Sequence, residues 1–137
     1  LKKIIKEFEK DQKQIQIPLS VFQHPKLSAL ESLCKYLKEE RLLRFSEIAN
    51  LLNRDDRTVW KTYDNAIKKK KSHFAIPPAS RTIPLALLTQ RPLTILESLI
   101  LYLKDDQTKS TKDIASLLLK KPKTVWATYT RAKKKHG

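Results

Sequence analysis

Two similar stretches decide the fold of this 137-residue chain: TVWKTYDNAIKK at residues 58–69 and TVWATYTRAKKK at residues 124–135. In each stretch the apolar residues recur with the period of an α-helix, and lysines follow toward the carboxyl end. Each stretch is therefore predicted to be a basic amphipathic helix, and each closes a similar unit of sequence.

The two stretches belong to a gapless repeat with an offset of 66 residues. Residues 17–70 align with residues 83–136, and 23 of these 54 positions are identical. The identities include Leu-Glu-Ser-Leu at residues 30–33 and 96–99. Such identity without a gap predicts one small fold used twice, and two copies are too few for a solenoid. We therefore expect tandem domains.

Composition narrows the classes of fold and partner. A formal charge of +15 calls for an anionic partner, most commonly nucleic acid and next an anionic membrane surface. The only glycine is Gly137, which excludes glycine-rich phosphate loops and argues against hairpin-rich sheets, so an all-α fold is expected. Cys34 has no partner for an internal disulfide and lies on an apolar helix face, where we expect a core residue. No apolar run is long enough to span a membrane, and no signal peptide is visible.

Capping signals place three helices in each unit. In the first unit Ser28 and Glu31 form a capping box that opens a helix at 29–40, a short helix follows at 46–53, and Asp55 caps a third helix that runs to about Lys70. In the second unit the matching signals are Thr94 with Glu97, Ser110 with Asp113, and Pro122 at the first position of the last helix.

The predicted organisation is an amphipathic helix at residues 1–16, a domain at 17–70 that begins with an extended lead-in, a linker at 71–82 and a domain at 83–137. The first helix is a brace on the first domain, a dimerising arm or a membrane-surface helix. The linker contains Pro77-Pro78 and is expected to be semi-rigid. Extended, it reaches roughly 40 Å, about the spacing of two DNA half-sites. Because the chain starts with Leu1, we expect a missing upstream region.

The order of helix, short helix, tight turn and basic helix resembles the helix-turn-helix of sigma-factor region four and of LuxR-type regulators. In the second unit the resemblance is carried by Leu93, Glu97, Ile114-Ala115, Leu118, Thr124-Val125, Arg131-Ala132 and Lys134. In the first unit it is carried by Leu27, Glu31, Ile48-Ala49, Leu52, Thr58-Val59, Ala66 and Lys68. The family often has glycine in the turn, where this chain has Asn53 and Leu119. Leucine disfavours a left-handed backbone, so the second turn is expected to differ in shape.

The resemblance implies that the third helix of each unit enters the DNA major groove. Residues 119–137 carry seven basic and no acidic side chains, whereas residues 53–71 also carry three aspartates, among them the outward Asp64. The second unit is therefore predicted to be the main reader. The predicted DNA-binding residues are Lys120, Lys121, Lys123, Thr124, Trp126, Ala127, Thr130, Arg131 and Lys134, with Arg57, Thr58, Trp60, Lys61 and Lys68 in the first unit.

The two tryptophans, Trp60 and Trp126, fall at the boundary between the core side and the surface of their helices. We expect half-buried residues at the core edge, and the alternatives are a DNA contact and a hydrophobic spot that binds protein. No enzyme chemistry is predicted. His24, His73 and His136 lack metal-ligand spacing, and no cofactor or metal is expected.

We therefore expect two tandem trihelical helix-turn-helix domains preceded by a short helix. The expected function is binding of double-stranded DNA, in transcriptional regulation, in a prokaryotic cytoplasm at the nucleoid. A protein–protein adaptor, on RNA polymerase or within its own assembly, is the alternative, because fold does not settle function. Non-specific nucleoid binding is a further alternative. A homodimer through residues 1–16 or the upstream region is a further expectation, and no membrane span is expected.

Overall fold

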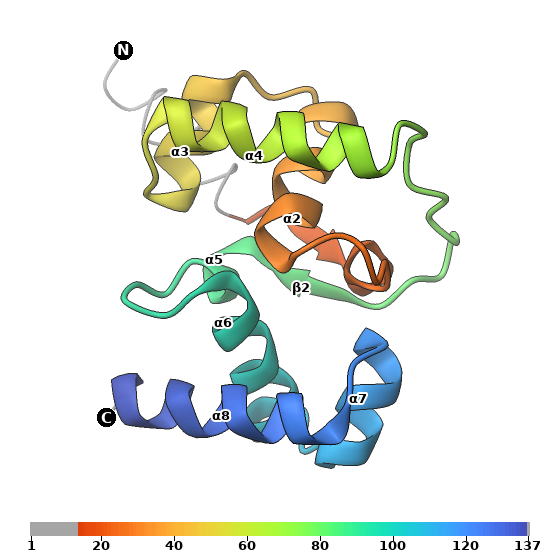
Figure 1. The fold of residues 1–137 in the computed structure, drawn as a ribbon, viewed down its shortest axis with the longest axis vertical. Helices are drawn as coiled ribbons and strands as arrows, with labels where there is room; N and C mark the ends of the chain where they lie inside the picture. The colour runs from red at the N-terminus through yellow and green to blue at the C-terminus, as the bar shows by residue number, and fades with distance from the viewer. Residues whose placement is uncertain (1–13, 137) are drawn as a thin grey trace.

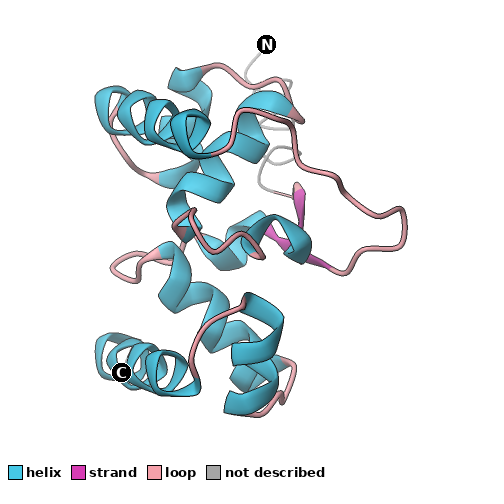
Figure 2. Cartoon of the chain, turned by 45° about the vertical axis from the view of Figure 1, so that its right-hand side comes forward, coloured by secondary structure: helices cyan, strands magenta, loops and turns pink. Residues whose placement is uncertain are grey.

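The computed structural model describes residues 14–136, in which helices predominate and two short strands form one small sheet (Figures 1 and 2). The helix predicted over residues 1–16, with its dimerising or bracing role, falls mainly outside these residues. Its predicted last positions are not helical, since Ile15 is buried without helical structure and Gln16 begins a strand. The predicted boundary at residue 16 is thus wrong, because this end of the segment joins the sheet.

The first repeat, called unit 1 below (residues 17–70), contains a 3-10 turn η1 (Leu19–Phe22) and the helices α2 (Ala29–Glu39), α3 (Phe45–Leu52) and α4 (Asp56–Lys69). The capping box at the start of α2 forms as predicted. The Ser28 hydroxyl accepts from the Glu31 N–H at 3.1 Å, and the Glu31 carboxylate accepts from the Ser28 N–H at 2.8 Å. Asp55 caps α4, accepting from the Thr58 N–H at 2.7 Å.

The second repeat, unit 2 (residues 83–136), contains α5 (Leu85–Leu88), α6 (Ile95–Leu101) with a π-helical continuation η2 (Tyr102–Asp106), α7 (Thr111–Leu118) and α8 (Pro122–His136). The box of Thr94 and Glu97 forms, and the Ser110 hydroxyl accepts from the Asp113 N–H at 3.1 Å. The three helices predicted in each unit, the second of them short, are therefore confirmed. The turns η1 and α5 were not predicted, because segments of four residues are too short to show a helical period, and η1 interrupts the lead-in that was expected to be extended.

The turn between the last two helices has the same shape in both units. Asn53 has φ 54° and ψ 49°, and Leu119 has φ 55° and ψ 45°. The expectation that the second turn differs is wrong. In both turns this residue's N–H reaches the carbonyls at the end of the preceding helix, so tertiary packing of the next helix imposes a left-handed backbone that leucine alone disfavours.

Replacing Leu119 with asparagine is expected to raise the free energy of unfolding by about 1 kcal/mol, because asparagine tolerates the left-handed conformation better than leucine. The side chain of Leu119 is 55% exposed, so little packing is lost. Urea denaturation of the variant and the unchanged chain measures the difference. The mirror change Asn53→Leu is expected to destabilise by a similar amount, and a destabilised Leu119→Asn chain would contradict the strain argument.

The small sheet joins the two units. Strand β1 (Gln16–Pro18) runs antiparallel to β2 (Thr82–Pro84), with Ile17 opposite Ile83. These two isoleucines occupy equivalent positions of the repeat. Units 1 and 2 are therefore related by an approximate two-fold axis that passes through this pair. The all-α prediction therefore needs correction to a mostly helical fold with one small sheet. The scarcity of glycine argues only against sheets built from tight hairpins. It did not predict this sheet, because the two strands are far apart in the sequence and need no tight turn between them.

A single hydrophobic cluster contains buried residues of both units, among them Ile17 and Leu33 from unit 1 and Ile83 and Leu99 from unit 2. The units are therefore packed against each other. The predicted linker at 71–82 does not set their spacing, because Phe74 is buried and Thr82 already lies in β2. Sequence patterns within one unit predict its own core but give no sign that the two cores merge.

Helices α4 and α8 occupy equivalent places in the two units. In Figure 1 they lie at opposite ends of the long axis, both in front of the other helices, and run in opposite directions. Figure 2 places both of them on the same side of the molecule. One face of the protein therefore presents two antiparallel helices related by the approximate two-fold axis.

Candidate nucleic-acid interface

The inward side of α4 and α8 is fixed by equivalent apolar residues. Val59 and Ala66 in α4, and Val125 and Ala132 in α8, are at most 1% exposed. The two residues of each pair are seven positions apart, which places them on one side of their helix. The opposite side of each helix faces solvent, most openly at Arg57, Lys61 and Lys68 in α4 and at Lys123, Ala127 and Thr130 in α8.

Two polar contacts repeat in both units and hold α4 and α8 in place. The Tyr63 hydroxyl donates to Glu39 at 2.9 Å, and the equivalent Tyr129 hydroxyl donates to Asp105 at 2.8 Å. Burial and the adjacent Glu39 carboxylate raise the pKa of Tyr63 to about 12. The neutral phenol is therefore kept as a hydrogen-bond donor at ordinary pH.

A second repeated contact ties the carboxyl end of each long helix to a capping glutamate. Lys69 lies 2.9 Å from the Glu31 carboxylate, and Lys135 lies 2.9 Å from that of Glu97. Burial alone would raise the pKa of Glu97, but hydrogen bonds from the Thr94 amide and from Lys135 lower it overall. These two lysines thus support the fold and are not free to meet a partner.

The predicted DNA-binding residues of unit 2 share one property, since all except Lys120, which is partly buried, are exposed. The exposed ones are Lys121, Lys123, Thr124, Trp126, Ala127, Thr130, Arg131 and Lys134. Arg131 is partly engaged, with its Nε 3.6 Å from the Glu97 carboxylate. The free cations nearest the start of α8 are therefore Lys121 and Lys123.

In unit 1 the predicted residues Arg57, Thr58, Trp60, Lys61 and Lys68 are all exposed. The Lys68 ammonium lies 2.9 Å from the carboxylate of Asp64, which is half-buried. This pair neutralises the acid that was expected to oppose phosphate. It also removes Lys68 from the free cations of α4, which leaves Arg57 and Lys61.

The tryptophans are half-buried but do not pack on the hydrophobic core. Trp60 is 53% and Trp126 is 55% exposed, as predicted for half-buried residues, but neither is among the described residues that pack against the core clusters, so the predicted place at the core edge is wrong. The Trp126 ring lies 5.8 Å from the Tyr129 ring, and the Lys104 ammonium lies 5.9 Å from its centre. Each tryptophan directly follows a buried valine, Val59 or Val125. One step along a helix turns the side chain by about 100°, which carries the tryptophan away from the core.

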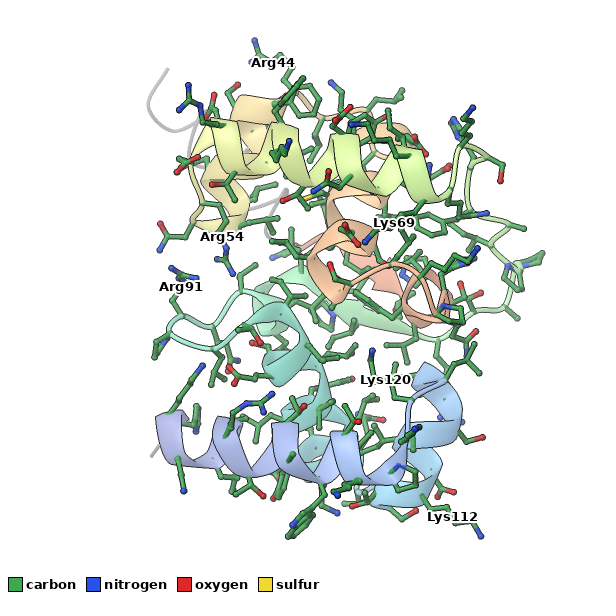
Figure 3. The ribbon with its side chains drawn as sticks, in the orientation of Figure 1. Arg44, Arg54, Lys69, Arg91, Lys112 and Lys120 are labelled. Carbon is green, nitrogen blue, oxygen red and sulfur yellow. The ribbon has the colours of Figure 1, made fainter. Side chains whose placement is uncertain are left out.

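Between the units lies a cavity of about 320 Å³ lined by four repeat-equivalent pairs: Ser28 with Thr94, Ala29 with Ile95, Leu30 with Leu96, and Arg54 with Lys120. Figure 3 shows Arg54 and Arg91 near each other on one side of the centre and Lys120 on the other. Burial and the charge of Arg91 lower the pKa of Arg54.

Sequence reasoning missed Arg54 and Arg91 as candidate site residues. For Arg54 a signal existed, because it is the repeat equivalent of the predicted Lys120. Arg91 had none, since only the packing of the two units brings it beside Arg54. The cavity between the units is therefore surrounded by positive charge, from Arg54 and Lys120 in its lining and from Arg91 beside Arg54.

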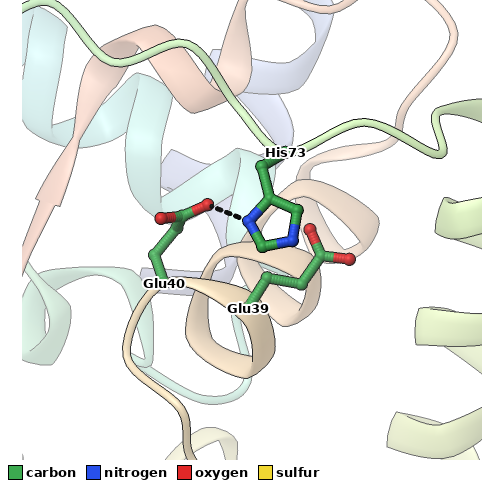
Figure 4. A group of neighbouring side chains, drawn as sticks. All are labelled: Glu39, Glu40 and His73. Atoms are coloured by element: carbon green, nitrogen blue, oxygen red, sulfur yellow. Dashed lines mark hydrogen bonds and ion pairs between the residues drawn. The ribbon is translucent and has the colours of Figure 1, made fainter.

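The structure also brings together His73, Glu39 and Glu40, whose ligand atoms lie within 4.8 Å of one another (Figure 4). The spacing of these residues along the chain does not predict a metal site, because folding alone brings the loop with His73 to the end of α2. Their groups already have partners: Glu40 lies 3.0 Å from His73 Nδ1, and Glu39 accepts from Tyr63 and Lys35. These contacts attach the segment after α4 to α2.

Comparisons with protein-family models, with curated proteins and with solved structures found no match to this chain. Within residues 14–136, no helix has the length and apolar character needed to cross a membrane.

Proposed function

We propose that this chain binds double-stranded DNA with two helix-turn-helix units, and that α4 and α8 enter the major groove as recognition helices. The observation that carries the proposal is the presence of two exposed, antiparallel helices on one face, related by the approximate two-fold axis at Ile17 and Ile83. Duplex DNA has local two-fold symmetry of its own, and its successive major grooves face the same side one turn apart.

The charge of the exposed surface supports this proposal. Lys121, Lys123 and Lys134 on or beside α8, and Arg57 and Lys61 on α4, are exposed. Neutralising six to ten phosphates would make the affinity fall about 10³–10⁵-fold between 50 and 200 mM salt. Unit 2 remains the proposed main reader because no acidic residue lies on α8.

The symmetry predicts the kind of DNA site. Two units related by a two-fold axis meet the same groove edges on opposite strands, so the preferred site is an inverted repeat of two half-sites. The half-sites are imperfect copies, because Lys61 and Asp64 of α4 are replaced by Ala127 and Thr130 of α8. Transcriptional regulation at the nucleoid in a prokaryotic cytoplasm is the proposed role.

The test is selection from random duplexes, followed by fluorescence anisotropy on the selected half-sites arranged as inverted repeats, direct repeats or single copies. We expect one chain per inverted repeat, bound at least about tenfold more tightly than the direct repeat at equal salt, because only one arrangement engages both helices. Equal affinity for all three arrangements would reject two-helix reading. No binding to any duplex at low salt would reject the DNA proposal itself.

The exposed tryptophans favour a second candidate, a protein–protein adaptor on RNA polymerase or in another assembly. Trp60 and Trp126 are more than half exposed, and tryptophan is common at the energetic centre of protein interfaces. This candidate gains support if Trp60→Ala and Trp126→Ala leave DNA binding unchanged but abolish binding of purified polymerase.

A further inference from the structure

The cavity between the units is built from equivalent positions of the two repeats. Ala29 and Leu30 from the first turn of α2 line it together with Ile95 and Leu96 from the first turn of α6. These four aliphatic side chains form an apolar wall. The volume of about 320 Å³ lies at the lower end of the roughly 300–1,000 Å³ of small-molecule pockets, which occur preferentially where domains meet.

The two cations in the lining lie on opposite sides of the centre of the molecule, as Figure 3 shows for Arg54 and Lys120. They occupy equivalent positions of the repeat, and both side chains are partly buried. The Arg54 guanidinium is held in place because it donates to the Leu52 carbonyl at 2.7 Å. The approximate two-fold axis that relates the units therefore also relates the two ends of the cavity.

The positive charge at this cavity has no matching carboxylate. Within residues 14–136, no carboxylate forms an ion pair with Arg54, Lys120 or the neighbouring Arg91. The glutamates of the two capping boxes do not supply it, since Glu31 and Glu97 are paired with lysines of α4 and α8. An anion that enters the cavity would therefore meet unpaired cations at both ends.

We propose that this cavity binds an elongated organic dianion of the α,ω-dicarboxylate type. One carboxylate meets the Arg54 guanidinium beside Arg91, and the other meets the Lys120 ammonium. The hydrocarbon between them packs on Leu30 and Leu96, where each buried methylene group adds to the affinity. An inorganic anion would leave the apolar wall unused, and a monocarboxylate would leave one end unpaired. The proposal does not depend on DNA binding.

The probes are the straight-chain dicarboxylates from succinate to sebacate, added without DNA to the isotope-labelled protein. At about 0.15 M salt the Debye length is about 8 Å, so attraction to distant charges is screened. Two-dimensional NMR is expected to show saturable shifts of the amides at residues 28–30 and 94–96. Affinity is expected to pass through a maximum at one length, because both ends must be met at once. The monocarboxylate with as many carbon atoms as the best dicarboxylate is expected to bind about tenfold more weakly.

Three variants locate the site. Lys120→Gln is expected to weaken the best dicarboxylate about tenfold and to leave the monocarboxylate unchanged, because the monocarboxylate is held at the end with two arginines. Lys121→Gln is the matched control, since it makes the same change of charge at the adjacent, exposed position, and it is expected to leave both affinities unchanged. Ala29→Phe fills the cavity without changing any charge and is expected to abolish the shifts, with the amide spectrum showing that the variant is folded.

Four results would overturn the proposal. The first two are the absence of saturable shifts with every dicarboxylate, and an affinity that does not depend on length or on the second carboxylate. The third is an equal loss in Lys120→Gln and Lys121→Gln, which would show only a general attraction of anions to a chain of charge +15. The fourth is unchanged binding to folded Ala29→Phe, which would place the ligand elsewhere.

Discussion

A chain carrying Lys121→Glu and Lys123→Glu is expected to bind duplex DNA about ten- to a hundredfold more weakly than the unchanged chain near ~0.1 M salt. Both lysines are exposed beside the first turn of α8, and no acidic residue of unit 2 forms an ion pair with them among the described contacts. Each lost phosphate contact also lowers the salt dependence of log affinity by about one. Anisotropy at several salt concentrations measures both quantities.

The matched control is Lys109→Glu with Lys112→Glu, which makes the same change in net charge within the same unit. Figure 3 shows Lys112 pointing away from the body at the end of unit 2, and acidic residues at the start of α7 favour its helix dipole. Arg131 is left unchanged, because a glutamate there would face Glu97 and disturb the fold. Equal losses in the two double variants would show that net charge alone drives binding, without a specific role for α8.

Replacing Ile83 with alanine is expected to lower the free energy of unfolding of the entire chain by about 2–5 kcal/mol. The side chain is fully buried and lies opposite Ile17, where the two units meet. Because one hydrophobic cluster spans both units, the loss is shared, and both units are expected to unfold in one transition.

The chain provides its own reporters for this prediction, since unit 1 contains Trp60 and unit 2 contains Trp126. Two backgrounds, Trp60→Phe and Trp126→Phe, each leave one fluorescent residue. In the Ile83→Ala chain, the unfolding midpoints reported by Trp60 and by Trp126 are both expected to fall to the same lower urea concentration. A shift of the Trp126 signal alone would mean that the units unfold separately. Leu42→Ala, at a position 81% exposed, is the control that removes no core packing.

The helix starts could be predicted from the sequence because they depend on local chemistry. Ser28 with Glu31 and Thr94 with Glu97 are neighbours in the chain, and their hydrogen bonds form as the spacing indicates. The inward positions of α4 and α8 were likewise predictable, since the helical period alone places Val59 and Ala66 on one side.

What could not be predicted depends on contacts between the units. The pairing of Ile17 with Ile83 leaves no trace in the period of either segment, and three-residue strands are too short to show one. The left-handed Leu119 and the proximity of Arg54 to Arg91 also follow from packing between distant residues.

The approximate two-fold axis at Ile17 and Ile83 lies within one polypeptide. Two-fold pairs built from separate subunits dissociate on dilution, so their occupancy of a target depends steeply on subunit concentration. Here the two halves are covalently joined and share a core, and the pair persists however dilute the protein is. The occupancy of a target is therefore expected to rise hyperbolically with the concentration of this protein, without the threshold that assembly of a dimer imposes.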